Sequence, residues 1–284
     1  MAVAMASPSL AATAPHQAPR LHPLNRDFRW EDTSFDQLRR VARAELAQFN
    51  ELGFFVLRDA FTPAEIVEVT AAIDPLEQAT DDYVREKKGG RHRLSATGAI
   101  TFSAHIVTKS PVLQAFARHP VIKDVCHDLI GGDVRLYWDQ AVYKKAEKLQ
   151  EFPWHQDNGY TFIEPQQYLT LWIPLVDVDE ENGCPWIAPG LHRLGTLEHW
   201  LTDIGLVCLT SAPDAVSAPA RAGDIVVFSS LAPHRTGPNL KAGSVRKAYI
   251  LQYAPDGAIT RLPDGQVLTQ SDPGRQFKIL ERGA

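Results

Sequence analysis

A histidine and a carboxylate stand one residue apart in the segment Trp154-His155-Gln156-Asp157. Residues two apart on a β-strand point to the same face, so a strand here would present the His155 imidazole and the Asp157 carboxylate to one point in space. A second histidine, His234, follows a predicted strand later in the chain. Two histidines and one carboxylate leave three adjacent positions open on an octahedral metal, which is typical of non-haem Fe(II) centres that bind a co-substrate and O₂ together. Each of these residues alone has an ordinary structural interpretation, but their order and spacing together predict a metal site.

Arg246 is the only charged residue on its face of the predicted strand 245–253. A guanidinium pairs with a carboxylate through two parallel hydrogen bonds, so Arg246 is predicted to bind a carboxylate such as the distal end of 2-oxoglutarate. Gln140 shares a predicted strand face with the apolar residues Trp138 and Val142. A buried amide needs a hydrogen-bond partner. A co-substrate carboxylate or a backbone group would serve, and the sequence leaves both open.

The elements that must position these residues change character along the chain. Up to residue 130, most apolar residues follow helical spacing or helix-capping patterns. After residue 133, short segments rich in Val, Ile, Leu and Tyr alternate with turn-forming residues, as antiparallel strands do. The elements predicted in this way are helices over 36–52, 63–73 and 111–130, and strands over 54–57, 134–143, 168–178, 224–228 and 245–253. Helices followed by many strands favour an α+β fold whose core is an antiparallel sandwich or barrel.

The composition is that of a folded protein, with 284 residues, 44% hydrophobic and 22% charged, which excludes a disordered, collagen-like or disulfide-scaffold chain. The formal net charge of −5 disfavours nucleic acid as a partner, because proteins that bind phosphate backbones usually carry a basic excess. No apolar run reaches the roughly 20 residues of a membrane helix, and the first fifteen residues lack the basic start of a signal peptide. The three cysteines are far apart, so we expect reduced thiols and a cytoplasmic location.

From about residue 49 to residue 253 the chain resembles the phytanoyl-CoA dioxygenase family of Fe(II)/2-oxoglutarate oxygenases. The resemblance begins with a helix-to-strand segment and continues through five further motifs that are highly specific as a set. These motifs are Asn50-Glu51-Leu52-Gly53-Phe54-Phe55-Val56-Leu57, Trp154-His155-Gln156-Asp157-Asn158, Asn182-Gly183 with Pro189-Gly190-Leu191-His192, Ala222-Gly223-Asp224, His234-Arg235-Thr236-Gly237-Pro238-Asn239 and Ser244-Val245-Arg246-Lys247-Ala248.

The resemblance implies a double-stranded β-helix, also called a jelly-roll or cupin-like core, flanked by N-terminal helices. Residues 1–30 are rich in Ala, Pro and His without a hydrophobic period, so we expect a flexible N-terminal tail there, packed on the outside or mobile. The remainder is expected to be a single oxygenase domain over 31–284, with a helical part over 36–130 and a jelly-roll core over about 133–255. The resemblance also implies roles for particular side chains. These are His155, Asp157 and His234 as iron ligands and catalytic residues, and Arg246, Thr236, Gln140 and Trp172 around 2-oxoglutarate.

The activity implied is that of a non-haem Fe(II)/2-oxoglutarate-dependent dioxygenase that hydroxylates an unactivated C–H bond of a small organic or acyl substrate, consuming O₂ and releasing succinate and CO₂. Halogenating relatives replace the metal-binding carboxylate with a small residue, so the presence of Asp157 favours hydroxylation. Desaturation and other outcomes stay open, as does the substrate, whether acyl-CoA, amino acid or natural-product intermediate. The basic loop 87–93 could bind a phosphate or carboxylate of that substrate. A monomer or homodimer is expected.

Two alternatives remain on sequence grounds. A cupin-like metal protein could use the same histidines and aspartate with another divalent metal for isomerisation, and it would not need Arg246. A non-catalytic member would bind a ligand and the co-substrate without turnover.

Overall fold

The computed structural model describes residues 18–34 and 37–284. In these ranges the longer helices precede most of the strands, as the sequence predicts. No helix of the described chain is long and apolar enough to span a membrane. The helical elements are α1 (Arg43–Leu52), α2 (Pro63–Lys87), η1 (Ile106–Thr108), α3 (Pro111–Phe116), α4 (Pro120–Leu129), α5 (Asp157–Tyr160) and η2 (Leu191–Leu194).

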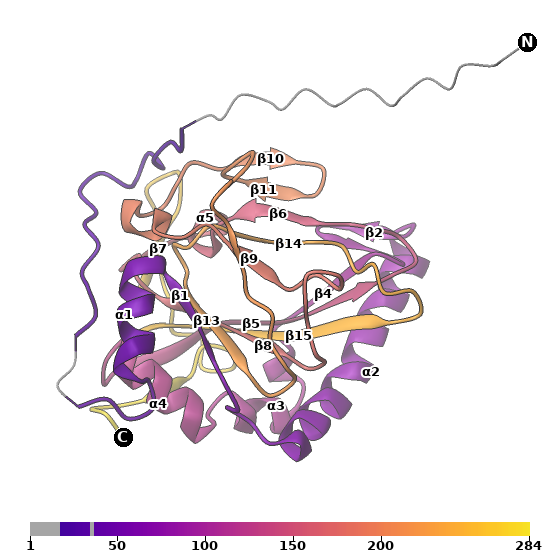
Figure 1. Cartoon of the computed structure of the whole chain (residues 1–284), viewed down its shortest axis with the longest axis horizontal. Helices are drawn as coiled ribbons and strands as arrows, with labels where there is room; N and C mark the ends of the chain where they lie inside the picture. Colours follow the sequence, from indigo (N-terminus) through magenta and orange to yellow (C-terminus); the bar gives the residue numbers. More distant parts are fainter. Residues whose placement is uncertain (1–17, 35–36) are drawn as a thin grey trace, which may run out of the picture.

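The strands of the described residues form two main antiparallel sheets, which are the two halves of a jelly roll (Figure 1). The larger sheet has nine strands in the order β1-β13-β8-β15-β5-β4-β3-β2, with β18 also paired to β5. Its strands are β1 (Phe54–Leu57), β2 (Arg91–His92), β3 (Ser95–Ala96), β4 (Ile100–Ala104), β5 (Val134–Lys145), β8 (Leu169–Pro174), β13 (Ile225–Ser229), β15 (Val245–Pro255) and β18 (Lys278–Leu280).

The smaller main sheet has four strands in the order β12-β9-β14-β6. They are β6 (Phe152–His155), β9 (Pro185–Ile187), β12 (Val216–Ser217) and β14 (His234–Thr236). Two accessory sheets, β10-β11 and β17-β16-β7, complete the described strands. Their strands are β7 (Phe162–Glu164), β10 (Trp200–Thr202), β11 (Gly205–Val207), β16 (Ile259–Arg261) and β17 (Val267–Thr269). The predicted α+β fold with a jelly-roll core is therefore confirmed.

Strand alternation divides the side chains of the larger sheet between two environments. On β8, Leu171 and Ile173 face helices α1 to α4 and join the main hydrophobic core, whereas Trp172 faces the smaller sheet. On β15, Leu251 belongs to the helix-covered core and Ala248 to the layer between the sheets. In Figure 1 these helices lie along the lower part and sides of the molecule, and the hairpin β10–β11 lies at the top. The helices thus cover one face of the larger sheet and leave the inter-sheet space for a functional site.

Two helix predictions are corrected by the structure. Helix α1 begins at Arg43 and not at residue 36, because the buried carboxylate of Asp128 accepts the backbone N–H groups of residues 39–41 and holds them outside the helix. The predicted helix 111–130 is two helices, α3 and α4. His119 precedes Pro120 and has extended backbone angles, since a residue before proline is disfavoured in the α conformation.

Part of the predicted tail is packed, and residues 1–17 lie outside the described residues. Leu21 forms an isolated bridge with Leu197, and the N–H of His22 donates to the carbonyl of Thr196 at 2.9 Å. The Asn25 side chain is buried and donates to the carbonyl oxygens of residues 194 and 196. These contacts pack residues 21–25 against the domain, which is one of the two arrangements expected for the tail, and the flexibility of the tail stays a prediction.

Candidate metal centre

His155, Asp157 and His234 meet at one point between the two main sheets. His155 ends β6 and pairs directly with His234 at the start of β14, and their ring centroids are 4.1 Å apart. Asp157 Oδ1 lies 3.8 Å from Nε2 of His155 and 3.9 Å from Nε2 of His234. One ligand atom from each of the three residues lies within 4.8 Å of the others, and no other group of three or more His, Cys, Asp or Glu in the described chain is so arranged.

Both imidazoles are held with Nε2 toward this point. Nδ1 of His155 donates to the carbonyl of Pro153 at 2.8 Å, and Nδ1 of His234 donates to the carbonyl of Ala232 at 3.0 Å. Because a carbonyl oxygen only accepts, this arrangement leaves each Nε2 lone pair free for a metal. Burial lowers the pKa of His155 well below its ordinary value, so its imidazole is neutral, which is the form that binds metal.

Asp157 belongs to a different element from the one that the sequence predicted. The strand ends at His155, because the N–H of Gln156 donates to Nε2 of His199 and not to a neighbouring strand, and Asp157 is the first residue of α5. The interpretation of the pair as one strand face is therefore wrong, although both side chains reach the same point. The hydroxyl of Thr170 donates a hydrogen bond to Oδ2 of Asp157, which leaves Oδ1 toward the histidines.

Arg246 is a fully buried cation with no carboxylate partner among the described residues. Its side chain is 1% exposed, and one terminal nitrogen donates to the carbonyl of Val142 at 3.0 Å. Its Nε has no hydrogen-bond partner in the described part of the chain. Burial lowers the pKa of Arg246 to about 9. The guanidinium lies 5.3 Å from the ring centroid of Trp172, on the face of the larger sheet that looks toward the metal-binding residues. Such a cation is arranged to receive an anion.

All seven predicted site residues line one cavity between the sheets. The histidines, Asp157 and Thr236 come from the side of the smaller sheet, and Gln140, Trp172 and Arg246 from the larger one. Their roles as ligands to metal and co-substrate stay predictions. The cavity is lined by Ile100, Phe102, Gln140, Val142, Phe152, His155, Asp157, Thr170, Trp172, Phe228, His234, Thr236, Arg246 and Ile250.

Lys144 is a residue of this region that the sequence analysis missed. It is fully buried, pairs with Arg246 across β5 and β15, and donates from Nζ to the carbonyls of Thr236 at 2.8 Å and Gly237 at 2.6 Å. Burial, together with the charge of Arg246, lowers the pKa of Lys144 well below its ordinary value. Its signal in the sequence is its place on the same strand face as Gln140 and Val142. Lys144 therefore holds the end of β14, where Thr236 faces the cavity.

The comparisons with known proteins agree on one family. The family model described as phytanoyl-CoA dioxygenase (PhyH) matches residues 49–248. A phytanoyl-CoA dioxygenase of Arabidopsis thaliana is 34% identical over 103 residues, which are 34% of this chain and 36% of that protein. The ectoine dioxygenase of Bordetella parapertussis is 22% identical over 218 residues, covering 69% of this chain and 70% of the relative.

Two solved structures show the same fold at low sequence identity. The α-ketoglutarate-dependent carbocyclase SnoK from nogalamycin biosynthesis superposes with a TM-score of 0.64 at 24% identity, covering 79% of this chain and 89% of SnoK. EctD from S. alaskensis, solved with 2-oxoglutarate and 5-hydroxyectoine, also gives a TM-score of 0.64, at 21% identity, covering 90% of this chain and 89% of EctD.

Proposed function

Because the chain belongs to the phytanoyl-CoA dioxygenase (PhyH) family, we propose that it is a non-haem Fe(II)/2-oxoglutarate-dependent dioxygenase that hydroxylates an unactivated C–H bond of a small organic or acyl substrate. The observation that carries this proposal is the buried, unpaired cation of Arg246 in the same cavity as the histidines and Asp157. A metal site alone is compatible with several chemistries. A metal site with a dedicated carboxylate receptor is what a 2-oxo acid co-substrate requires.

The donor set fits Fe(II). Nε2 of His155, Nε2 of His234 and Oδ1 of Asp157 would hold the metal on one side and leave its other positions for ligands. When bound, the iron with 2-oxoglutarate and O₂ supplies the oxidising power that inserts oxygen into a C–H bond, with succinate and CO₂ as co-products. Burial keeps the His155 imidazole neutral, the Nδ1 hydrogen bonds orient both imidazoles, and Thr170 orients the carboxylate of Asp157.

The residues around Arg246 fit the far end of 2-oxoglutarate. The guanidinium would bind the distal carboxylate, and the hydroxyl of Thr236, from the opposite sheet, would add a hydrogen bond. Trp172 would pack against the carbon chain. The side-chain amide of Gln140 has no hydrogen-bond partner in the described part of the chain, so it is free to bind a ligand oxygen. Asp157 would fill the third ligand position, which supports hydroxylation over halogenation.

We further propose a cytoplasmic enzyme that acts on a small molecule as a monomer or homodimer. All three cysteines are free and buried, which suits a reducing compartment. Burial raises the pKa of the Cys208 thiol above its ordinary range, so this thiol stays protonated and unreactive at neutral pH.

The test is an anaerobic titration of metal-free protein with Fe(II) and 2-oxoglutarate, followed by the visible metal-to-ligand charge-transfer band. We expect the band in the wild type, its loss in His155→Ala and Asp157→Ala, and a higher 2-oxoglutarate requirement in Arg246→Lys. Arg193→Gln changes an exposed arginine outside the cavity and is the matched control. Iron binding without any band at saturating 2-oxoglutarate would contradict the proposal and favour a metal-dependent isomerase or a binding protein.

A further inference from the structure

A wider cavity opens directly beside the metal-binding residues. It has a volume of about 540 Å³ and shares His155, Asp157 and Gln140 with the inner cavity. Cavities of roughly 300–1,000 Å³ enclose drug-sized ligands. Any molecule placed here lies against the proposed iron site, so the chemistry of the wall reports the chemistry of the substrate.

The wall of this cavity is aromatic and carries little charge. Six Phe, Tyr and Trp side chains line it, and these are Tyr83, Phe102, Tyr137, Trp138, Phe152 and Tyr160. The side-chain amides of Gln140 and Gln252 face the cavity without hydrogen-bond partners in the described chain. Among the described lining residues, the only Asp or Glu is Asp157, whose carboxylate would bind the metal, and the only Lys or Arg is Arg93. A substrate with a free ammonium group would therefore find no anionic partner here.

Arg93 occupies a turn position that favours glycine. It follows His92 in the two-residue turn of the hairpin β2–β3 and has a φ of 52°. Such hairpin turns usually place Gly at a position with positive φ, because a side chain is strained there. Four non-glycine residues of the described chain have positive φ, and two of them, Arg93 and His105, line this one cavity. Residues with strained backbone conformations cluster at active sites and ligand-binding positions.

The Arg93 guanidinium has no hydrogen bond or ion pair to the described residues, and its side chain is exposed. The other basic residues of the loop do not line the cavity: Arg91 donates to the carbonyl of Asp203, and Lys88 lies 5.7 Å from the ring centroid of Tyr83. One free cation is suited to one anionic group. A polyphosphate such as that of coenzyme A would need several.

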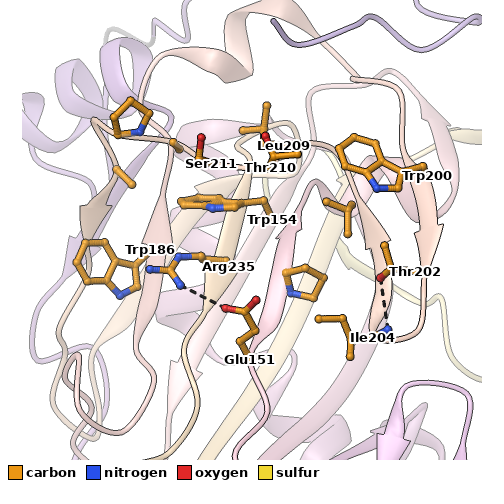
Figure 2. A pocket seen from close by; sticks show the side chains of 15 residues that line it. Glu151, Trp154, Trp186, Trp200, Thr202, Ile204, Leu209, Thr210, Ser211 and Arg235 are labelled. Atoms are coloured by element: carbon orange, nitrogen blue, oxygen red, sulfur yellow. Dashed lines mark hydrogen bonds and ion pairs between the residues drawn. The ribbon is translucent and has the colours of Figure 1, made fainter. Parts of the chain in front are cut away.

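A second aromatic cavity contains an arginine that, unlike Arg93, has partners within the protein. It has a volume of about 640 Å³, lies on the outer face of the smaller sheet and contains Arg235 (Figure 2). That guanidinium lies 5.5 Å from the ring centroid of Trp154 and 5.4 Å from that of Trp186, and it pairs with Glu151 at 3.5 Å. Arg235 is thus already neutralised, whereas Arg93 is not.

We propose that the substrate is a drug-sized molecule with an aromatic or polycyclic body and a single anionic group, which Arg93 binds at the wall of the cavity while the body lies against the aromatic side chains. This inference rests on the proposed function for its link to catalysis. The binding preference itself follows from the cavity and is measurable without turnover.

The test compares three naphthalenes of the same size that differ in charge: 2-naphthoate, 2-naphthamide and 2-(aminomethyl)naphthalene. Their dissociation constants are measured by isothermal titration calorimetry on protein loaded anaerobically with Fe(II) and 2-oxoglutarate. We expect naphthoate to bind about five- to tenfold more tightly than the amide, and the amine to bind most weakly. Equal or tighter binding of the amine, or tighter binding of coenzyme A than of naphthoate, overturns the proposal.

Three variants locate the preference. Arg93→Gln should make naphthoate and naphthamide bind equally, and Arg93→Gly should do the same while raising the melting temperature, because it relieves the positive φ. Arg235→Gln alters the other aromatic cavity and should leave the preference unchanged. A preference that persists in Arg93→Gln, or disappears in Arg235→Gln, overturns the assignment to Arg93.

The charge-transfer band separates this proposal from the proposed function. The band should form normally in Arg93→Gln, because Arg93 lies outside the inner cavity. If wild-type protein gives no band but still prefers naphthoate through Arg93, the oxygenase function fails and the selectivity of the cavity stands. If the band forms but the preference is absent, the substrate inference fails alone.

Discussion

Replacing Arg246 with methionine should stabilise the ligand-free protein while it weakens 2-oxoglutarate binding. Burial lowers the pKa of Arg246 from 12.5 to about 9. One pKa unit corresponds to about 1.4 kcal/mol, so the buried charge destabilises the ligand-free fold by about 5 kcal/mol at any pH below 9, where arginine is charged in both the folded and the unfolded chain. This destabilisation falls away as the pH rises through the range from 9 to 12.5.

Methionine has a similar length and no charge, so Arg246→Met removes this destabilisation. It also removes the hydrogen bond to the carbonyl of Val142, which is worth about 1.5–3 kcal/mol because the donor is charged. The net expectation is a gain of about 2–3.5 kcal/mol in the free energy of unfolding without ligand. At roughly 2 °C per kcal/mol for a protein of this size, that corresponds to a rise of roughly 4–7 °C in melting temperature. Losing one partner of a buried charge pair should weaken 2-oxoglutarate binding by at least about 30-fold.

Both quantities are measured on the same preparations, by calorimetry of metal-free protein and by anaerobic titration of the Fe(II) form with 2-oxoglutarate. Arg246→Lys keeps a charge in the cavity and should show weaker binding without the stability gain. Arg235→Met is the control, because it removes an arginine that is already paired with Glu151. It should neither stabilise the ligand-free protein nor weaken 2-oxoglutarate binding. A ligand-free Arg246→Met protein that is less stable than the wild type, and that binds 2-oxoglutarate equally well, would refute the reasoning.

Three further predictions concern other buried groups. Burial raises the pKa of Asp139 from 3.8 to about 6, so the wild type loses about 3 kcal/mol of stability as the pH rises through that range. Asp139→Asn lacks this titration. Urea unfolding at pH 4 and pH 7 should therefore show that the free energy of unfolding of the variant, relative to that of the wild type, increases by about this amount between the two pH values. Thr170→Val should lower Fe(II) affinity about 10- to 100-fold in metal competition titrations, since the hydroxyl orients Asp157, while leaving the melting temperature of metal-free protein within about 2 °C. Gly53→Ala should lower the melting temperature markedly, because Gly53 has a φ of 84° and its Cβ would lie 2.6 Å from Nδ1 of His192.

The hydrophobic pattern predicts the sheet more accurately than it predicts the helix boundaries. The strand expected over 245–253 is β15, Val245–Pro255, since its alternation reflects two distinct buried faces. The start of α1 could not be predicted in the same way. It depends on Asp128, which is far away in the sequence and has no partner that local spacing reveals.

The candidate site shows the same division between local and distant information. The pair His155 and Asp157 was found by its spacing, but the supposed strand geometry was wrong, because the partner that ends the strand is His199, a residue 44 positions after His155. The burial of Lys144 could not be predicted from the sequence, because a lysine on a strand usually faces solvent. Its burial is explained by the carbonyls of Thr236 and Gly237, which only the packing of β14 against β5 brings to it.

The metal-binding and substrate-binding parts of the site are built on different elements, and this explains why motifs reveal one and not the other. The proposed ligands lie on β6, α5 and β14, where the sheet ladder and Nδ1 hydrogen bonds fix them and spacing is therefore strongly constrained. Part of the wall of the cavity beside them comes from α2 and the hairpin β2–β3, which are different elements from those that carry the ligands. Substitutions at Arg93 can therefore change which molecule binds without moving His155 or His234. The substrate class must be inferred from the charge and shape of this wall, because the same ligand motif is compatible with many substrates.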